Sequence, residues 1–124
     1  MKWNIFHDES NGIINVVVEG QIQAQKTAEM AIQGIEFARE NNCNKFLIDY
    51  RLADVKDSTM DTYNFMANLE KLGLSHTDKI AIIYSQDKKK HHFAETVAVN
   101  RGWSNIHYFF EIDSATNWLL IKTI

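Results

Sequence analysis

The sequence of 124 residues contains no proline, a single cysteine and no long apolar run. With Cys43 alone, the chain can form neither an internal disulfide nor a metal site built from several cysteines. A membrane-spanning helix needs about 18 or more consecutive apolar residues, so no membrane span is predicted. The formal net charge is −3, whereas general nucleic-acid binders are usually basic, so no nucleic-acid partner is expected.

The chain also lacks a linker, a low-complexity stretch and an internal repeat. A chain of this length is expected to form one domain, 1–124, and to bury roughly two-thirds of its unfolded surface. The first residues, Met1-Lys2-Trp3-Asn4, lead directly into patterned sequence without the apolar core of a signal peptide. A soluble cytoplasmic protein is therefore expected.

Hydrophobic patterning predicts strands that alternate with helices after an opening hairpin at Asn11-Gly12. The predicted elements, in chain order, are the strands Trp3–His7 and Ile13–Glu19, the helix Ala24–Asn41, the strand Lys45–Tyr50, the helix Ser58–Leu72, the strand Lys79–Ser85, the helix Lys88–Arg101, the strand Ile106–Phe110, and a short helix capped by Asp113. Repeated strand–helix units give parallel strands with right-handed crossovers. The predicted fold class is α/β, a mixed five-stranded sheet with four helices in the order ββαβαβαβα.

The apolar pattern also predicts which side chains face the core. The run Phe46-Leu47-Ile48 does not alternate with polar residues, which is typical of a strand that is covered on both faces. Two helices carry apolar stripes at helical spacing, Phe65, Met66, Leu69 and Leu72 in one and Phe93, Ala94, Val97 and Ala98 in the other.

Polar side chains follow the carboxyl ends of the predicted parallel strands, which is where open α/β sheets usually bind ligands. Ser58 begins a helix there and, with Asp61, resembles a capping box. We expect one rim to gather the candidate binding or phospho-switch residues, which are Asp49, Arg51, Asp57, Ser58, Ser85 and Asp87.

The element order, with Asp49, Asp57 and Ser58 placed around the third strand, resembles STAS domains, which share the anti-anti-sigma-factor fold. The segment 93–102, followed by Phe110 and by 115–119, is similar to the SpoIIAA-like branch of small bacterial proteins, most of which are uncharacterised. The resemblance covers essentially the whole chain and implies this fold. In STAS-domain regulators a partner kinase phosphorylates the matching serine, here Ser58, but Thr59-Met60 replace the usual Ser-Gly continuation of the motif. The resemblance therefore does not imply that this switch is kept.

Ser58 and the basic run each allow both a structural and a functional interpretation. Ser58 is either simply a helix N-cap, worth about 1 kcal/mol, or also a phosphate acceptor at a helix N-terminus. Asp57 and Asp61 oppose the second role by like-charge repulsion. The basic run 88–90, followed by His91 and His92, is either a solvated helix start or a docking patch for an acidic partner or a phosphate.

The sequence gives little sign of a metal, a cofactor or a catalytic motif. The histidines have no HExxH-like spacing, and His91 and His92 would point about 100° apart on a helix. Cys43 has no neighbouring base in the sequence. Glu95, Asn100 and Arg101 are explained by packing and capping at the end of a helix. We therefore expect no metal site and no cofactor.

The first functional hypothesis is a non-enzymatic regulatory or protein-interaction module that binds a protein partner near Ser58. The alternative is a small-molecule or lipid carrier with an apolar pocket between the sheet and the helices, and an enzyme that uses the rim acids is the least favoured. Side chains alternate between the two faces along a strand, and by this alternation Tyr50, Tyr84 and Tyr108 are expected on the same sheet face. If that face is the less covered one, it would hold an apolar ligand or the second copy of a homodimer.

Overall fold

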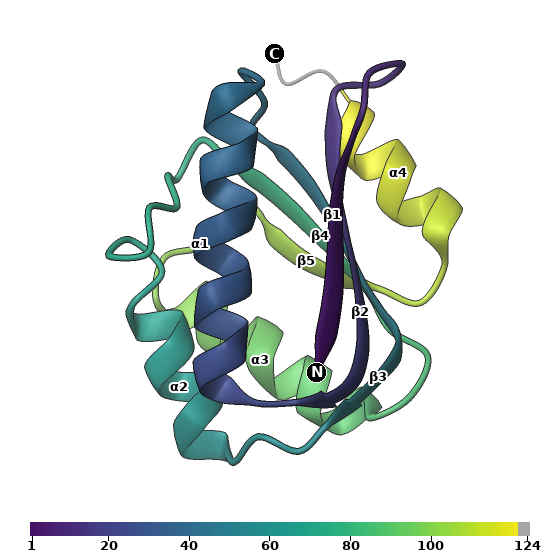
Figure 1. Ribbon diagram of the computed structural model, residues 1–124. Helices are drawn as coiled ribbons and strands as arrows, with labels where there is room; N and C mark the ends of the chain where they lie inside the picture. Colours follow the sequence, from purple (N-terminus) through teal and green to yellow (C-terminus); the bar gives the residue numbers. More distant parts are fainter. Residues whose placement is uncertain (122–124) are drawn as a thin grey trace.

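The computed structural model describes residues 1–121, which form one mixed sheet with helices on both faces (Figure 1). The strands lie side by side in chain order, and they are β1 (Lys2–Asp8), β2 (Ile13–Ile22), β3 (Lys45–Val55), β4 (Lys79–Ile83) and β5 (Ile106–Phe109). β1 is antiparallel to β2, and the remaining neighbours are parallel. The predicted α/β fold with its mixed five-stranded sheet is confirmed.

The helices are α1 (Ala24–Glu40), α2 (Thr59–Ala67), α3 (Lys88–Asn100) and α4 (Ile112–Leu120). From β2 to β5 the sheet grows in one direction, and right-handed crossovers then place every connecting helix on the same face. Figure 1 shows α1, α2 and α3 on that face and α4 on the other. Among residues 1–121, no helix has both the length and the apolar character required to span a bilayer.

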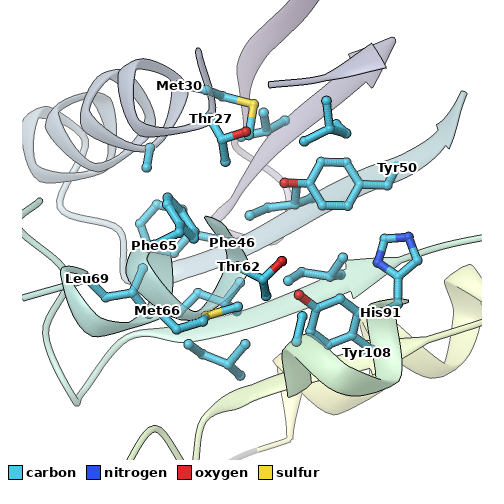
Figure 2. Close-up of a pocket in the computed structure, with 18 of the residues that line it drawn as sticks. Thr27, Met30, Phe46, Tyr50, Thr62, Phe65, Met66, Leu69, His91 and Tyr108 are labelled. Atoms are coloured by element: carbon cyan, nitrogen blue, oxygen red, sulfur yellow. The ribbon is translucent and has the colours of Figure 1, made fainter. Parts of the chain in front are cut away.

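Side chains alternate across the sheet and divide the core between its two faces. Phe46, Ile80 and Ile106 form one row across three strands and pack under α1, α2 and α3. Leu47 and Ala81 point the other way, into a smaller cluster completed by Ala115 and Leu119 of α4. The third strand is therefore covered on both faces, as predicted. On the side of α1, α2 and α3, the packing leaves the cavity shown in Figure 2.

The predicted end of the third strand was wrong, because β3 runs past Tyr50 to Val55. After a register shift between Val17 and Glu19, the extra residues continue the parallel pairing with β2 as far as the pair Ile22 and Val55. The fourth strand was predicted too long, since β4 ends at Ile83 and Ser85 lies in the following loop. β3 therefore extends beyond its neighbour on that side.

Two predictions about helices also need correction. α2 ends at Ala67 instead of Leu72, because the Asn68 side chain donates to the Asn64 carbonyl at 2.7 Å and the chain then turns. Leu69 is still buried, but from this turn and not from the helix. In α3 the predicted inward residue Phe93 is 37% exposed, and the buried position belongs to His91.

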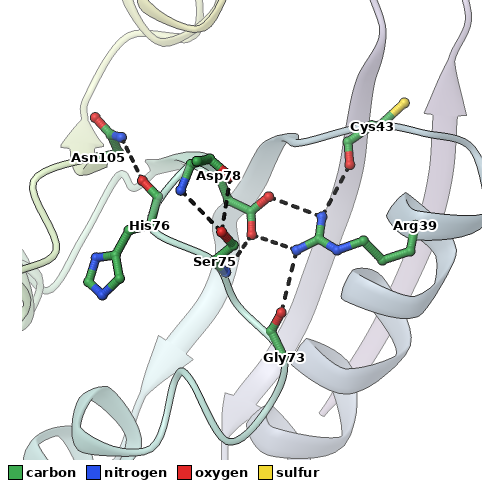
Figure 3. Close-up of polar contacts among 8 residues, drawn as sticks. Arg39, Cys43, Gly73, Ser75, His76, Asp78 and Asn105 are labelled. Atoms are coloured by element: carbon green, nitrogen blue, oxygen red, sulfur yellow. Dashed lines mark hydrogen bonds and ion pairs between the residues drawn. The ribbon is translucent and has the colours of Figure 1, made fainter.

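An ion pair joins α1 to the start of β4 at the amino end of the parallel strands (Figure 3). The two terminal guanidinium nitrogens of Arg39 donate to the carboxylate of Asp78, at 3.0 and 2.6 Å. The same carboxylate accepts from the Ser75 amide at 2.8 Å, and Arg39 also donates to the carbonyl oxygens of Cys43 and Gly73. Asp78 is 1% exposed, so Arg39 supplies the counter-charge to a buried carboxylate.

We predict that Arg39→Ala lowers the free energy of unfolding by roughly 3 kcal/mol, because it leaves a buried carboxylate without its partner. Urea denaturation measures the change. The matched control is Lys26→Ala, which removes a surface pair with Glu29 whose side chains are both 50% exposed, and which should cost less than about 1 kcal/mol. Equal losses in the two variants would contradict a structural role for the buried pair.

Candidate functional site

Ser58 is the N-cap of α2, as the sequence predicts, and its side chain is exposed. Its Oγ accepts from the backbone N–H of Asp61 at 3.1 Å. The Asp61 carboxylate accepts in return from the Ser58 N–H at 3.3 Å, which completes a capping box. The Ser58 hydroxyl therefore lies at the electropositive start of a helix and within reach of solvent.

Asp57 lies half-buried beside this helix start. Burial raises the pKa of its carboxyl group above the ordinary value, and the charge of Asp61 raises it further, while Lys90 acts in the opposite direction. The Lys90 ammonium itself donates to the Val55 carbonyl at 2.7 Å. One member of the basic run is therefore used within the fold, while Lys88 and Lys89 remain exposed.

Ser85 and Asp87 bind the part of β3 that extends beyond β4. The Ser85 hydroxyl donates to the Arg51 carbonyl at 3.1 Å, and the Asp87 carboxylate accepts from the Val55 N–H at 3.1 Å. Between them, the Gln86 amide donates to the Ala53 carbonyl at 3.1 Å. These side chains replace the ladder bonds that β4 no longer supplies, which gives Ser85 and Asp87 a structural role.

Asp49 and Arg51 form a bidentate ion pair, with contacts of 2.9 and 2.7 Å. Burial opposes the charge on Asp49, but the hydrogen bonds from Arg51 outweigh it and hold the pKa of that carboxyl below its ordinary value. Strand alternation places Asp49 on the sheet face opposite to Tyr50, and the ion pair holds the Arg51 side chain beside it. The predicted rim is therefore divided: Asp49 and Arg51 lie on the opposite sheet face, whereas Asp57 and Ser58 lie at the start of α2 and Asp87 lies at the start of α3.

The cavity under α1, α2 and α3 has a volume of about 130 Å³. Its walls are largely apolar and come from the sheet and from all three helices, with Met30, Phe46, Phe65, Met66 and Leu69 among the residues labelled in Figure 2. The hydroxyl groups of Tyr50, Thr62 and Tyr108 point into it in the same view. Val55, Asp57 and Lys90 line it where it approaches the start of α2.

Burial raises the pKa values of the Tyr50 and Tyr108 hydroxyl groups well above the ordinary range. The nearby charge of Asp57 acts in the same direction on Tyr50, and the neighbouring Tyr50 and Glu95 do so on Tyr108. Both phenols therefore stay protonated and remain hydrogen-bond donors. The three tyrosines lie on one sheet face, as predicted, but this is the face covered by α1, α2 and α3 and not a less covered one.

His91 lies among these tyrosines. Its ring centroid is 5.1 Å from that of Tyr84, 5.5 Å from that of Tyr108 and 5.8 Å from that of Tyr50. His91 was predicted as part of the basic run, but it is buried. The spacing of His91, Ala94 and Ala98 was the available signal, because these positions share one face of a helix.

Other side chains singled out in the sequence have structural partners. Glu95 accepts from the Tyr108 N–H at 2.8 Å on the open edge of β5, and Arg101 lies over the ring of Tyr63 at 4.6 Å. Cys43 has a histidine neighbour that the sequence did not reveal, with its Sγ 3.4 Å from Nε2 of His7. No group of three or more His, Cys, Asp or Glu side chains within the described part of the chain is arranged to hold a metal ion.

Comparison with solved structures identifies the fold. An anti-sigma factor antagonist from Mycobacterium paratuberculosis superposes with a TM-score of 0.60 at 13% identity, over 95% of this chain and 94% of that one. The Bacillus cell fate determinant SpoIIAA in its phosphorylated form gives a TM-score of 0.53 at 9% identity, over 94% and 99% of the two chains. No family model and no curated relative matches the sequence. The chain has the SpoIIAA-like STAS fold, as its sequence predicts.

We predict that the burial of His91 makes stability depend on pH. Burial lowers its pKa below the ordinary value of 6.5, and the nearby charge of Asp87 only partly offsets this. The unfolded chain then binds more protons, so the stabilising contribution is complete above pH 6.5 and is lost as the pH falls towards the folded-state pKa. The slope reaches at most about 1.4 kcal/mol per pH unit.

Urea denaturation at several pH values between about 5.5 and 7.5 measures this slope. In His91→Phe, the part of the pH dependence of the unfolding free energy that His91 contributes should disappear. The matched control is His92→Phe, which changes an exposed histidine and should keep this pH dependence. Identical pH slopes in the wild type and His91→Phe would contradict the prediction.

Proposed function

We propose that this chain is a regulatory module that binds a protein partner through the outer face of α2, and that phosphorylation of Ser58 controls the binding. One observation carries the proposal. The exposed hydroxyl at the N-cap of α2 is followed within two turns by two exposed apolar side chains, Met60 at 64% and Tyr63 at 45%. A modifiable group and an apolar contact surface therefore lie on the same short helix.

The outer surface of α2 has the composition of a protein contact. Tyr63 is held by Arg101, whose guanidinium lies over its ring at 4.6 Å. Tyrosine and arginine are enriched among the residues that dominate binding energy at protein interfaces. This stacking also orients the ring before a partner arrives, which reduces the entropy cost of binding.

Phosphoryl transfer to Ser58 would change the charge at this surface. A partner kinase would transfer the terminal phosphoryl group of a nucleoside triphosphate to Oγ, with release of the nucleoside diphosphate and the hydroxyl proton. The product carries about −1.5 to −2 charges at neutral pH. The helix N-terminus favours that charge, whereas the carboxylates of Asp57 and Asp61 repel it.

The attraction of the phosphate by the helix N-terminus and its repulsion by nearby carboxylates would both act at the capping box. The Asp61 carboxylate is held at the Ser58 N–H, so a phosphate on the same residue competes with it directly. We expect phosphorylation to displace Asp61 and to rearrange the first turn of α2, which carries Met60. The switch would then act through the shape of the contact surface as well as through its charge.

The solved structures of the same fold support a role of this kind. One is an anti-sigma factor antagonist, and the other is SpoIIAA in its phosphorylated form. In the proposal, this chain likewise acts by binding a protein and carries out no reaction of its own. It requires no cofactor, and it works in the cytoplasm, where a kinase and its nucleotide are present.

We predict that a photo-crosslinker placed at position 63 captures a partner in a manner that depends on Ser58. Tyr63→p-benzoylphenylalanine, expressed in the source organism with Ser58→Ala, should give a defined protein adduct by mass spectrometry. Phosphoserine installed at position 58 should reduce that adduct at least tenfold. Intact mass of the native chain should show a phosphorylated fraction.

The matched control places the same crosslinker at Phe6, an exposed aromatic of β1. Adducts from position 6 should not respond to phosphoserine at position 58. Circular dichroism checks folding, because the loss of the N-cap in Ser58→Ala costs about 1 kcal/mol. An adduct from position 63 that is unchanged by phosphoserine would contradict the proposed switch.

A further inference from the structure

The cavity between the sheet and α1, α2 and α3 combines apolar walls with a small number of convergent hydroxyl groups (Figure 2). Those of Tyr50 and Tyr108 come from β3 and β5, which lie on either side of β4, and that of Thr62 comes from α2. An apolar pocket with a few polar groups aimed at its centre is the usual form of a small-molecule site.

These hydroxyl groups are available to a ligand. Among the described residues, none provides a hydrogen-bond partner for the side-chain oxygens of Tyr50, Thr62 and Tyr108. They face the cavity and are not enclosed by protein atoms, since no buried side-chain nitrogen or oxygen within residues 1–121 is without a partner. A ligand oxygen in the cavity can therefore form hydrogen bonds with them. The rings are fixed in place, since His91 is stacked beside Tyr50 and lies against Tyr108. The donors are therefore held in position before anything binds.

We infer that the cavity binds an uncharged molecule of about the size of a single ring, which carries one oxygen able to form hydrogen bonds. The volume of about 130 Å³ is close to that of an engineered cavity of about 150 Å³ that binds benzene. It is smaller than the pockets of about 300 Å³ or more that hold larger ligands, so a long acyl chain does not fit. The oxygen would satisfy the tyrosine and threonine donors.

The charge of the surroundings selects a neutral ligand. The groups that face the interior are the neutral phenols, a threonine hydroxyl and His91, whose neutral form is favoured by burial. The charged lining residues are Asp57 and Lys90, which carry opposite charges and lie towards the start of α2. A buried anion or cation would gain no net counter-charge there, and it would lose its hydration.

We expect α2 to be the wall of the cavity that moves most easily when a ligand enters. Its buried anchor is Met66, whereas five residues of α1 and four of α3 are buried. Thr62, Phe65 and Met66 are at once part of α2 and part of the cavity wall. This helix is therefore the wall that opens at least cost. The inference does not depend on phosphorylation of Ser58, which lies on the outside of the same helix.

Titration of the isotope-labelled full-length protein by NMR tests the inference, with phenol, toluene and benzoate as probes. Phenol should bind saturably and shift the amide signals of Tyr50, Thr62 and Tyr108. Toluene, which has the same ring without the oxygen, should bind roughly fivefold more weakly for each hydrogen bond lost. Benzoate should not bind, because its charge has no counter-charge in the cavity.

Two variants separate the cavity from the surface. Tyr108→Phe keeps the ring and removes one donor, so it should weaken phenol roughly fivefold and leave toluene unchanged. Ala94→Leu places a larger side chain on the cavity wall and should abolish binding of both. If Ala94→Leu fails to fold, the comparison of Tyr108→Phe with the wild type still shows whether phenol binds in the cavity. Absence of saturable phenol binding, or equal binding of phenol to the wild type and Tyr108→Phe, would overturn the inference and leave a cavity filled by water.

Discussion

The placement of α2 over the parallel strands is the constraint on which the rest of this structure depends. The helix is short, it begins at the capping box of Ser58 and Asp61, and it is anchored inside by Met66. Leu69, in the turn that follows, adds a second buried anchor. Because these contacts are few, α2 approaches the sheet without filling the space beneath it. The cavity and the exposed helix face are two consequences of the same light packing.

The two proposals therefore concern opposite sides of one element. The outer side of α2 carries Ser58, Met60 and Tyr63, and the inner side carries Thr62, Phe65 and Met66. A change in the first turn of the helix would reach the cavity wall within one or two residues. If both proposals hold, an occupied cavity and a phosphorylated N-cap would each bias the position of the same helix, which is a coupling between two sites.

Much of the fold could be predicted because the pattern of apolar and capping residues within each segment indicates its secondary structure. Apolar residues change between strand-like and helix-like spacing along the chain, and this predicted the order of the elements. The spacing of Ser58 and Asp61 predicted the start of α2. The extension of β3 to Val55 could not be predicted, since it depends on backbone pairing with β2 and on side chains from a distant loop. His91 was predicted to be part of the basic run because it is polar, although its spacing from Ala94 and Ala98 places it on the buried face of the helix. The cavity depends on how three helices pack together, which no local pattern records.

Hydrogen exchange of individual backbone amides tests the central claim most directly, since local opening lowers protection in the element that opens. If α2 is a lightly anchored cover, the amides of Phe65 and Met66 should exchange with much less protection than those of Ala38 in α1 and Leu47 in β3. Equal protection at these positions, in the range set by global unfolding, would show that α2 is fixed to the core and would contradict this description of the site.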